Sequence, residues 1–367
     1  AWNYRMAGEN PGNRLEHQEI YLTVPASFDA VARELTVQAA RSAGLERFTL
    51  LEEPQAAFYA WIDANRGEWR TIVGVGESIL VCDVGGGTTD LSLIEVVDEE
   101  GNLELRRVAV GEHILLGGDN MDLTLAYAVR AKLAQRGTQI DNWQFRALSH
   151  QCRKAKERLL NNPELESEPL VILGRGSSLI GSTIRSELTR GEIEQILVQG
   201  FFPDCAPTDF PVQQPRVGIR EMGLPYESDP AVTHHLAKFL SRHVTQGETD
   251  PADPWQQQEQ SKVAYPSAVL FNGGVMKAES LRGQVLDVLG RWRGKGSLRE
   301  LQAVDLDQAV ALGATYYGLA RRNDGLRIRA GTSRSYYIGV ESSMPAVPGI
   351  PTPVNALCVV SFGMEEG

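Results

Sequence analysis

The run Ile79-Leu80-Val81-Cys82-Asp83-Val84-Gly85-Gly86-Gly87-Thr88-Thr89-Asp90 carries the clearest structural signal in this sequence. An apolar segment leads into three consecutive glycines, and β-branched and apolar residues dominate positions 88–97 after them. This order predicts a buried strand, a glycine turn and a second strand, which together form a hairpin. Because glycine has no Cβ, we expect the turn to adopt φ > 0 and to bring its N–H groups against a ligand.

The same turn has the polar groups that a phosphate site needs. A nest of N–H groups suits phosphate oxygens, and Thr88 can add a hydroxyl donor. Asp83 and Asp90 flank the turn, and carboxylates beside phosphates require a cation between them, for which Mg²⁺ is the natural choice. The turn is not a P-loop, because it lacks the G-K-[ST] ending and a strand follows it. Three glycines alone more often make a plain hairpin turn, so the two acids are what favour phosphate binding.

Two further glycine turns lie at predicted helix starts. Leu116–Asp119 precedes a helix predicted over 121–133, and Phe271–Gly274 links a strand predicted over 268–271 to a helix over 278–289. Each turn places bare backbone at a helix N-terminus, which is a ready anion site. Either turn alone would be interpreted as a tight connection. Together with the first turn, they favour one nucleotide held between two lobes.

Composition limits the classes of partner. The chain has 367 residues, 42% hydrophobic and 23% charged, which predicts two to three globular domains. Its net charge of −11 argues against binding to nucleic acid or to an anionic membrane. The 4 cysteines form no C-x-x-C pair, which excludes a disulfide scaffold and a zinc ribbon and predicts a reducing, cytoplasmic location. No apolar run approaches the ~20 residues of a membrane span.

The remaining pattern alternates strands and helices. Apolar periodicity and cap residues predict helices over 29–42, 55–62, 145–160, 190–198 and 306–319, and strands over 19–25, 48–51, 103–110 and 170–173. Residues 203–266 differ, because they hold nine of the 18 prolines and only one amphipathic piece, over 234–243. We expect this insertion to be functional, partly helical or mobile.

A family resemblance rests on seven pieces in a fixed order: Leu22–Phe28, Glu52–Ala57, Val81–Leu91, Gly117–Asp119, Cys152–Leu159, Val269–Gly274 and Asp307–Ala314. With these pieces, which span about residues 20–325, the chain resembles the Hsp70-type chaperones of the actin/hexokinase/Hsp70 ATPase superfamily. The resemblance implies an α/β fold: an actin-like (ribonuclease H-like) ATPase domain with two lobes, followed by the start of a β-rich domain. It also implies ATP or ADP with Mg²⁺ as cofactors.

The resemblance also implies a division of the chain. Residues 1–76 would be the remainder of the first lobe, and 77–304 the second lobe, with a helical subdomain over about 113–190 and the Pro-rich insertion over 203–266. Residues 305–325 would return to the first lobe. Residues 326–367 would form a linker and the start of a β-rich peptide-binding domain.

By the same resemblance, four residues would form the catalytic centre. Asp83 corresponds to the carboxylate near Mg²⁺ and the attacking water, and Thr88 to the γ-phosphate threonine. Asp90 is the second acid of that turn. Glu53 corresponds to the glutamate that reaches a magnesium-bound water, so Asp83 and Glu53 are the metal-associated pair.

Further positions would contact the nucleotide or transmit its state. Pro25 and Arg33 match a proline and an arginine that couple nucleotide state to the peptide-binding domain. Lys156 would lie at the ribose and Asp307 at the adenosine. The positions expected to line the nucleotide are Gly85, Gly86, Gly87, Gly117, Gly118, Lys156, Gly273, Gly274, Lys277 and Asp307.

Some family features are changed or missing. Arg153 and Glu157 stand where the family usually has an acid and a base, and Lys277 replaces an arginine that can stack on the base. The family's opening phosphate loop and its catalytic lysine have no counterpart. We therefore expect a fragment of a divergent member, which by itself would hydrolyse ATP poorly or not at all.

Three functions remain open at the level of sequence. The first is an ATP-hydrolysing chaperone that binds unfolded or peptide clients, works with J-domain and nucleotide-exchange cochaperones, and belongs to the stress response. The second is a nucleotide-sensing pseudo-ATPase, because the adenine-facing positions are altered. The third is an actin-like filament protein or a sugar kinase, which the β-type runs after Arg322 argue against.

Overall fold

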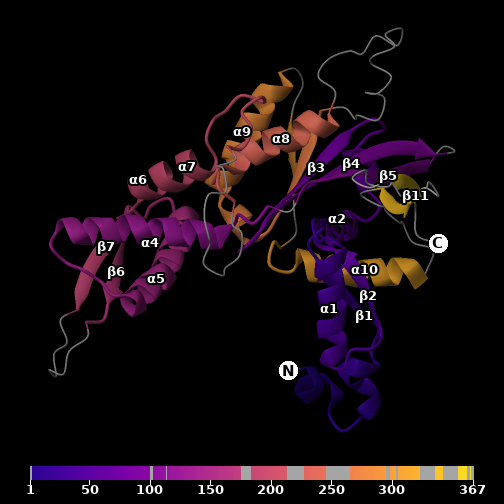
Figure 1. Ribbon diagram of the computed structural model, residues 1–367, viewed down its shortest axis with the longest axis horizontal. Helices are drawn as coiled ribbons and strands as arrows, with labels where there is room; N and C mark the ends of the chain where they lie inside the picture. Colours follow the sequence, from indigo (N-terminus) through magenta and orange to yellow (C-terminus); the bar gives the residue numbers. More distant parts are fainter. Residues whose placement is uncertain are drawn as a thin grey trace, which may run out of the picture.

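A central sheet of five strands organises the structure, a computed structural model that describes residues 2–99, 102–112, 114–174, 183–212, 227–244, 265–294, 298–302, 305–322, 335–341, 354–361 and 364. Its strand order is β5-β4-β3-β8-β9 (Figure 1). The first three strands form an antiparallel meander, and the last two run parallel to β3. The strands are β3 (Ser78–Val84), β4 (Thr89–Glu99), β5 (Asn102–Val110), β8 (Ala268–Asn272) and β9 (Arg299–Leu301).

Both faces of β3 are covered, so every residue of this strand is buried. Ile79 and Val81 pack with apolar side chains of α2 (Glu53–Ala64), whereas Leu80 and Cys82 pack on the opposite face. This alternation follows from the period of two along a strand. By the same period, Asp83 belongs to the face that α2 covers.

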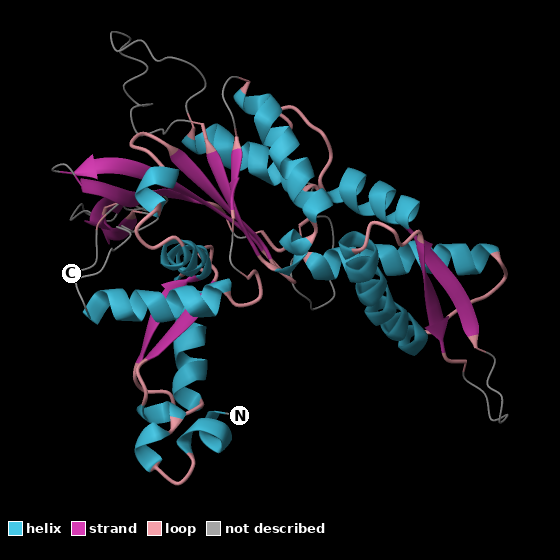
Figure 2. Cartoon of the chain, turned by 180° about the vertical axis from the view of Figure 1, so that it is seen from behind, coloured by secondary structure: helices cyan, strands magenta, loops and turns pink. Residues whose placement is uncertain are grey.

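The opposite face of the sheet carries the larger core. Helices α8 (Val232–His243) and α9 (Glu279–Arg293) contribute apolar side chains to the same cluster as Leu80 and Cys82. A helical part extends away from the sheet at this side (Figures 1 and 2). It comprises α4 (Gly118–Gln135), α5 (Asn142–Asn161), the antiparallel strands β6 (Ser167–Ile172) and β7 (Ile184–Thr189), α6 (Arg190–Ile193), a π-helix (Glu194–Val198) and α7 (Gln199–Phe201).

A smaller layer packs against α2. Strands β1 (Ile20–Val24) and β2 (Phe48–Glu52) pair in parallel, joined by α1 (Ala30–Ser42). Helix α10 (Ala309–Arg322) crosses α2 at a very short distance, since a Cβ added at Gly313 would lie 1.7 Å from the carbonyl oxygen of Ala56. Glycine is therefore required at this crossing. The short helix α3 (Trp69–Ile72) leads from α2 towards the central sheet.

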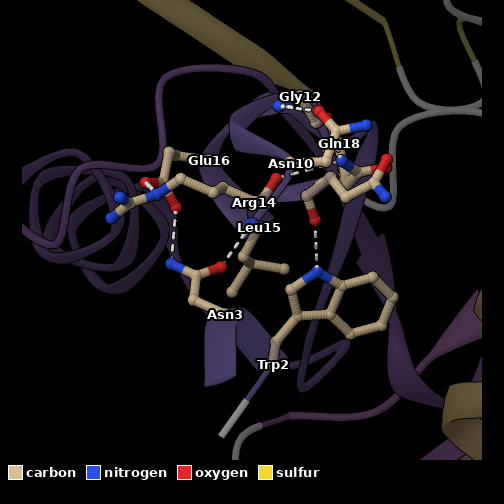
Figure 3. A network of polar contacts seen from close by, with 9 residues as sticks. Trp2, Asn3, Asn10, Gly12, Arg14, Leu15, Glu16 and Gln18 are labelled. Atoms are coloured by element: carbon tan, nitrogen blue, oxygen red, sulfur yellow. Dashed lines mark hydrogen bonds and ion pairs between the residues drawn. The ribbon is translucent and has the colours of Figure 1, made fainter. Parts of the chain in front are cut away.

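The N-terminal segment is ordered by polar contacts rather than by a core. It forms a π-helix (Asn3–Ala7) and two 3₁₀ turns (Pro11–Asn13 and Leu15–His17), and Ala7 is its only buried residue within those elements. The Asn3 side chain joins the π-helix to the second turn by donating to Glu16 (2.9 Å) and accepting from the Leu15 amide (2.7 Å), as Figure 3 shows.

At the other end, β10 (Tyr336–Glu341) and β11 (Val354–Val360) form an antiparallel hairpin. Its apolar side chains are largely exposed, and Ile338 and Leu357 are more than half exposed. No helix in the described ranges combines the length and the apolar character that crossing a membrane requires.

Most of the predicted elements are confirmed. The hairpin of β3 and β4, the helices α1, α2, α4, α5, α8, α9 and α10, and the strands β1, β2, β5, β6 and β8 are all present, with ends shifted by a few residues. The elements that were missed include the short N-terminal helices, the 3₁₀ turn at Gly274–Lys277, α3, β7 and β9. Helix α3 lies in a segment that glycines and polar residues mark as a break, and β7 and β9 are short strands without clear alternation. Of the Pro-rich insertion, positions 213–226 and 245–264 lie outside the described residues.

Candidate functional site

Three polar side chains lie in a row across the ends of three adjacent strands. Asp83 pairs with Asp90 across β3 and β4, and with Asn272 across β3 and β8. Directly opposite residues on neighbouring strands share a face of the sheet. All three residues are buried, with 6% of Asp83, 3% of Asp90 and 2% of Asn272 exposed. Polar groups this deeply buried require hydrogen-bond partners, and the partners show how each side chain is positioned.

Asp83 accepts a hydrogen bond at one carboxylate oxygen and lies against a glycine at the other. The side-chain amide of Asn272 donates to Oδ2 at 2.7 Å. The next residue, Gly273, has φ +87°, and a Cβ there would lie 2.6 Å from Asp83 Oδ1 and 2.3 Å from the carbonyl oxygen of Val84. Only glycine can adopt this conformation at this distance. The turn after β8 therefore closes directly over the end of β3.

Asp90 is tied to the loop between β1 and α1. The hydroxyl of Ser27 donates to Asp90 Oδ1 at 2.5 Å, and the Ser27 amide approaches the same oxygen at 3.3 Å. Ser27 is 6% exposed. This contact joins the β1–α1 layer to the central sheet through a buried hydrogen bond.

Glu53, at the first turn of α2, completes a cluster of carboxyl groups. Burial, followed by the charges of Asp83 and Asp90, raises the pKa of Glu53 to about 7. Burial also raises the pKa of Asp83 to about 6, opposed by the hydrogen bond from Asn272 and reinforced by the charge of Asp90. Like charges that raise one another's pKa in a buried site are relieved by a cation. Across the described part of the chain, however, no three His, Cys, Asp or Glu side chains are arranged to ligate a metal directly.

The glycine turn after β3 is braced by the start of α4. The amides of Gly118 and Asp119 donate to the carbonyl oxygens of Gly85 (3.0 Å) and Gly86 (2.7 Å). A Cβ at Gly117 would lie 2.6 Å from the Gly86 oxygen and 2.7 Å from the Gly85 oxygen, so a side chain there would separate the two turns. The first two amides of α4 are therefore used to bind the glycine turn after β3.

Two expectations about the turns are therefore wrong. Gly85, Gly86 and Gly87 do not adopt φ > 0, because the hairpin turn is closed by a hydrogen bond from the Gly85 amide to Thr88 O (2.9 Å) with ordinary backbone angles. The amides of Gly118 and Asp119 are not available to an anion. The amides of Gly86, Gly87 and Thr88 have no acceptor in the part of the chain that the structure describes, so they remain the donors for an anion.

A cavity of about 230 Å³ opens beside this turn. Lys156 is buried in its wall, where Nζ lies 2.6 Å from Asp122 Oδ1 and donates to the carbonyl oxygen of Gly118 (3.3 Å). The Lys156 ammonium thus braces the start of α4. The other predicted residues in the cavity wall are Gly85, Gly86, Gly118, Gly274, Lys277 and Asp307.

Two ion pairs form the rim of this cavity. Arg153 Nε lies 3.2 Å from Glu157 Oε1 along α5, and Lys277 Nζ lies 2.5 Å from Asp307 Oδ2. Their side chains are 40–64% exposed, so solvent screens both pairs. The altered residues Arg153 and Glu157 are thus paired with each other, and the altered Lys277 is paired with Asp307.

Arg33 lies in a second cavity, of about 460 Å³. Its guanidinium donates to the carbonyl oxygen of Phe28 (3.0 Å) and to Glu52 (2.7 Å), and Arg107 also pairs with Glu52. Ser27 borders this cavity and donates to Asp90, while Glu52 directly precedes Glu53. Pro25 ends β1 just before this loop and is not part of the cavity wall.

Most of the predicted residues therefore fall into three groups. Asp83, Asp90 and Glu53 form the carboxyl cluster, part of each glycine turn lines the first cavity together with Lys156, Lys277 and Asp307, and Arg33 lies in the second. The remaining predicted residues line neither cavity, and they are Pro25, Gly87, Thr88, Gly117 and Gly273. The sequence analysis missed Asn272, Ser27, Asp122 and Arg107 as site residues. Only Asn272 had a local signal, because it is a polar residue that ends the apolar run of β8 next to Gly273.

A comparison with protein-family models identifies the family of the chain. The model described as "Hsp70 protein" matches residues 12–208, which is more than half of the chain. The matched segment contains Glu53, the β3–β4 hairpin, and helices α4 and α5. The order of strands in the central sheet and the mixed helices around it fit the actin-like fold of that family. The chain belongs to the Hsp70 family of ATP-binding chaperones.

Proposed function

We propose that this chain contains the nucleotide site of an Hsp70-type chaperone that binds Mg·ATP and couples its hydrolysis to the binding of peptide or unfolded clients. The observation that supports this most directly is the row of Asp90 and Asp83 next to a turn with free amides. Acids and unpaired N–H donors in one place suit a phosphate with its counter-ion. Family membership supports the assignment to ATP rather than to another phosphate.

In this proposal each side chain has a limited task. Asp83 would orient the attacking water, and Thr88 would donate its hydroxyl to the terminal phosphate. Asp90, fixed by Ser27, would support Asp83 from the neighbouring strand. Bound through water by Asp83 and Glu53, Mg²⁺ would supply positive charge to the phosphates. The chemistry is phosphoryl transfer to water, in which catalysis depends on positioning and electrostatics.

The nucleotide itself would occupy the first cavity. The free amides at Gly86, Gly87 and Thr88 would contact its phosphates. Gly273 and Gly274 would approach it from the turn after β8. Lys156 and Lys277 would lie towards the ribose and the base, with Asp307 beside Lys277.

The division of the chain and the partners are part of the same proposal. We assign residues 1–76 and 305–325 to one lobe, 77–304 to the other, and 326–367 to the linker and a β-rich peptide-binding domain. The separate sheet β1–β2, the packing of α10 on α2 and the exposed β10–β11 hairpin support this division. We also propose J-domain and nucleotide-exchange cochaperones and a cytoplasmic location, by analogy with the family.

A second candidate is a slow nucleotide switch with little turnover. The rim favours it, because Lys277 stands where the family has an arginine that can stack on the base, and Arg153 is paired with Glu157. In this case nucleotide would change the state of the protein by binding rather than by hydrolysis.

Calorimetry of the full-length protein with Mg·ATP and with Mg·ADP tests the proposal, followed by a single-turnover hydrolysis assay. Binding of both nucleotides with measurable turnover is expected. Binding without turnover would select the switch. No binding of either nucleotide would contradict both functions.

A further inference from the structure

Asn272 is a polar residue in a place where the fold alone would favour an apolar one. The other residues of β8 are Ala, Val, Leu and Phe, and all are buried. An amide buried without full hydrogen bonding costs about 1–3 kcal/mol. Asn272 is 2% exposed, and its Oδ1 has no hydrogen-bond partner among the described residues. The fold thus tolerates a polar group that does not help it to pack.

The amide nitrogen of Asn272 has one partner, and that partner is Asp83. Nδ2 donates to Asp83 Oδ2 at 2.7 Å. Asp83 and Asn272 are paired residues of parallel strands, so the backbone ladder sets their separation. A hydrogen bond to an ionised carboxylate is about twice as strong as a neutral one. This bond fixes the plane of the Asp83 carboxylate.

We propose that Asn272 is a positioning residue of the phosphoryl-transfer site, whose Nδ2 orients the Asp83 carboxylate and whose Oδ1 accepts a hydrogen bond from a water at that carboxylate. The inference rests on the proposed function. Asn272 acts through Asp83 and through water, and makes no contact with the nucleotide. An apolar residue could fill the same volume but could do neither task.

The position of Gly273 supports this role. Its bare Cα faces Asp83 Oδ1, while Asn272 holds Oδ2. Two consecutive residues of one turn thus determine how both oxygens of Asp83 are presented. The unpaired Oδ1 of Asn272 therefore lies next to the Asp83 carboxylate, which would orient the attacking water.

The test uses the full-length protein with Asn272→Leu, which keeps the size of the side chain but removes both polar atoms. Asn272→Thr is the second variant, because it suits a strand and its hydroxyl ends one atom short of the amide nitrogen. Asn65→Leu is the control, since it removes an amide that donates to Trp61 O at the end of α2, away from Asp83. The measurements are ADP affinity in EDTA, Mg²⁺ affinity of the ADP complex, single-turnover rate with Mg·ATP, and thermal unfolding.

For folded Asn272 variants we expect the single-turnover rate to fall by about 10- to 100-fold and Mg²⁺ affinity to weaken by about 10-fold, the loss of a hydrogen bond to a charged group. ADP affinity in EDTA should stay within about threefold of wild type. Asn65→Leu should keep the wild-type rate and Mg²⁺ affinity.

Three other outcomes would contradict the inference. Wild-type rate and Mg²⁺ affinity in either folded Asn272 variant would overturn the inference while leaving the proposed function intact. Equal losses in rate, Mg²⁺ affinity and ADP affinity would show that Asn272 only supports the fold, which also overturns it. A wild-type protein that binds no Mg·ADP would overturn the proposed function, and this inference with it.

Discussion

Asp83 is the residue on which the proposed chemistry depends most. Its buried carboxylate is held by Asn272 and Gly273, so a change from carboxylate to amide alters charge without changing shape. We expect Asp83→Asn in the full-length protein to lower single-turnover hydrolysis by about 100-fold or more, because the group that orients water is lost. Nucleotide affinity should change much less. Calorimetry and a quenched single-turnover assay measure the two effects.

The matched control is Asp287→Asn, an exposed position on α9. It should retain both turnover and affinity. If Asp83→Asn hydrolyses ATP at the wild-type rate, Asp83 has no part in the mechanism.

The raised pKa of Glu53 predicts that the stability of the protein depends on pH. Burial and the charges of Asp83 and Asp90 raise its pKa to about 7 from an ordinary 4.5. The folded protein therefore binds more protons than the unfolded chain between these values, so the contribution of Glu53 to stability falls as pH rises from about 4.5 to about 7. Glu53→Gln should raise the free energy of unfolding of the nucleotide-free protein by roughly 1–2 kcal/mol at pH ~8, after solvent screening of this half-buried group, and by almost nothing at pH ~4.

Urea unfolding at the two pH values measures this difference. Glu46→Gln, an exposed position before β2, should change stability by less than about 0.5 kcal/mol at either pH. A gain for Glu53→Gln of the same size at both pH values would show that the carboxyl charge is not the cause.

At the scale of elements, the crossing of α2 and α10 is the tightest contact in the smaller layer. A Cβ at Gly313 would lie 1.7 Å from Ala56 O and 2.9 Å from the Ala60 amide, both of which are backbone atoms. Gly313→Ala must therefore push the helices apart, and we expect a loss of about 2–4 kcal/mol in the free energy of unfolding. Denaturant titration measures it.

The control for this prediction lies in α9. Gly283 is also inside a helix, but a Cβ there would meet nothing within 4 Å. Gly283→Ala should be neutral or stabilising by about 0.5–1 kcal/mol, because alanine favours helix. Equal effects at the two positions would show that the helix crossing is looser than the structure indicates.

The elements also show what the sequence could and could not predict. The β3–β4 hairpin was predictable, because its apolar run, glycines and flanking acids are contiguous. The contact between Asn272 and Asp83 was not, since it joins residues 189 positions apart and depends on parallel pairing of β8 with β3. The backbone angles of Gly85–Gly87 were wrongly predicted, because the turn closes through the hydrogen bond from the Gly85 amide to Thr88 O without a positive φ, and the glycine that close packing requires is Gly117 at the start of α4.

At the scale of the whole molecule, the second cavity is connected to the carboxyl cluster through Ser27, which donates to Asp90, and through Glu52. Glu52 forms ion pairs with Arg33 and Arg107, and Glu53 follows Glu52 at the start of α2. We expect Arg33→Ala to keep basal hydrolysis within about threefold but to lose its stimulation by peptide, because it removes one of the two arginines that pair with Glu52 and leaves the carboxyl cluster unchanged. Hydrolysis with and without a peptide client measures this.

Arg41→Ala is the control on the same helix, since Arg41 is exposed in the last turn of α1. It should leave both basal and stimulated rates unchanged. Normal stimulation of Arg33→Ala would remove Arg33 from the coupling.

The buried thiol of Cys82 can report how often the central sheet opens. It lies in β3 beside Asp83, is fully buried, and burial raises its pKa to about 12. A thiol of this kind reacts with an alkylating reagent only after the central sheet has opened. The labelling rate at Cys82, followed by mass spectrometry, therefore reports how often the sheet opens, and a ligand that binds across β3, β4 and β8 must slow it in proportion to its occupancy.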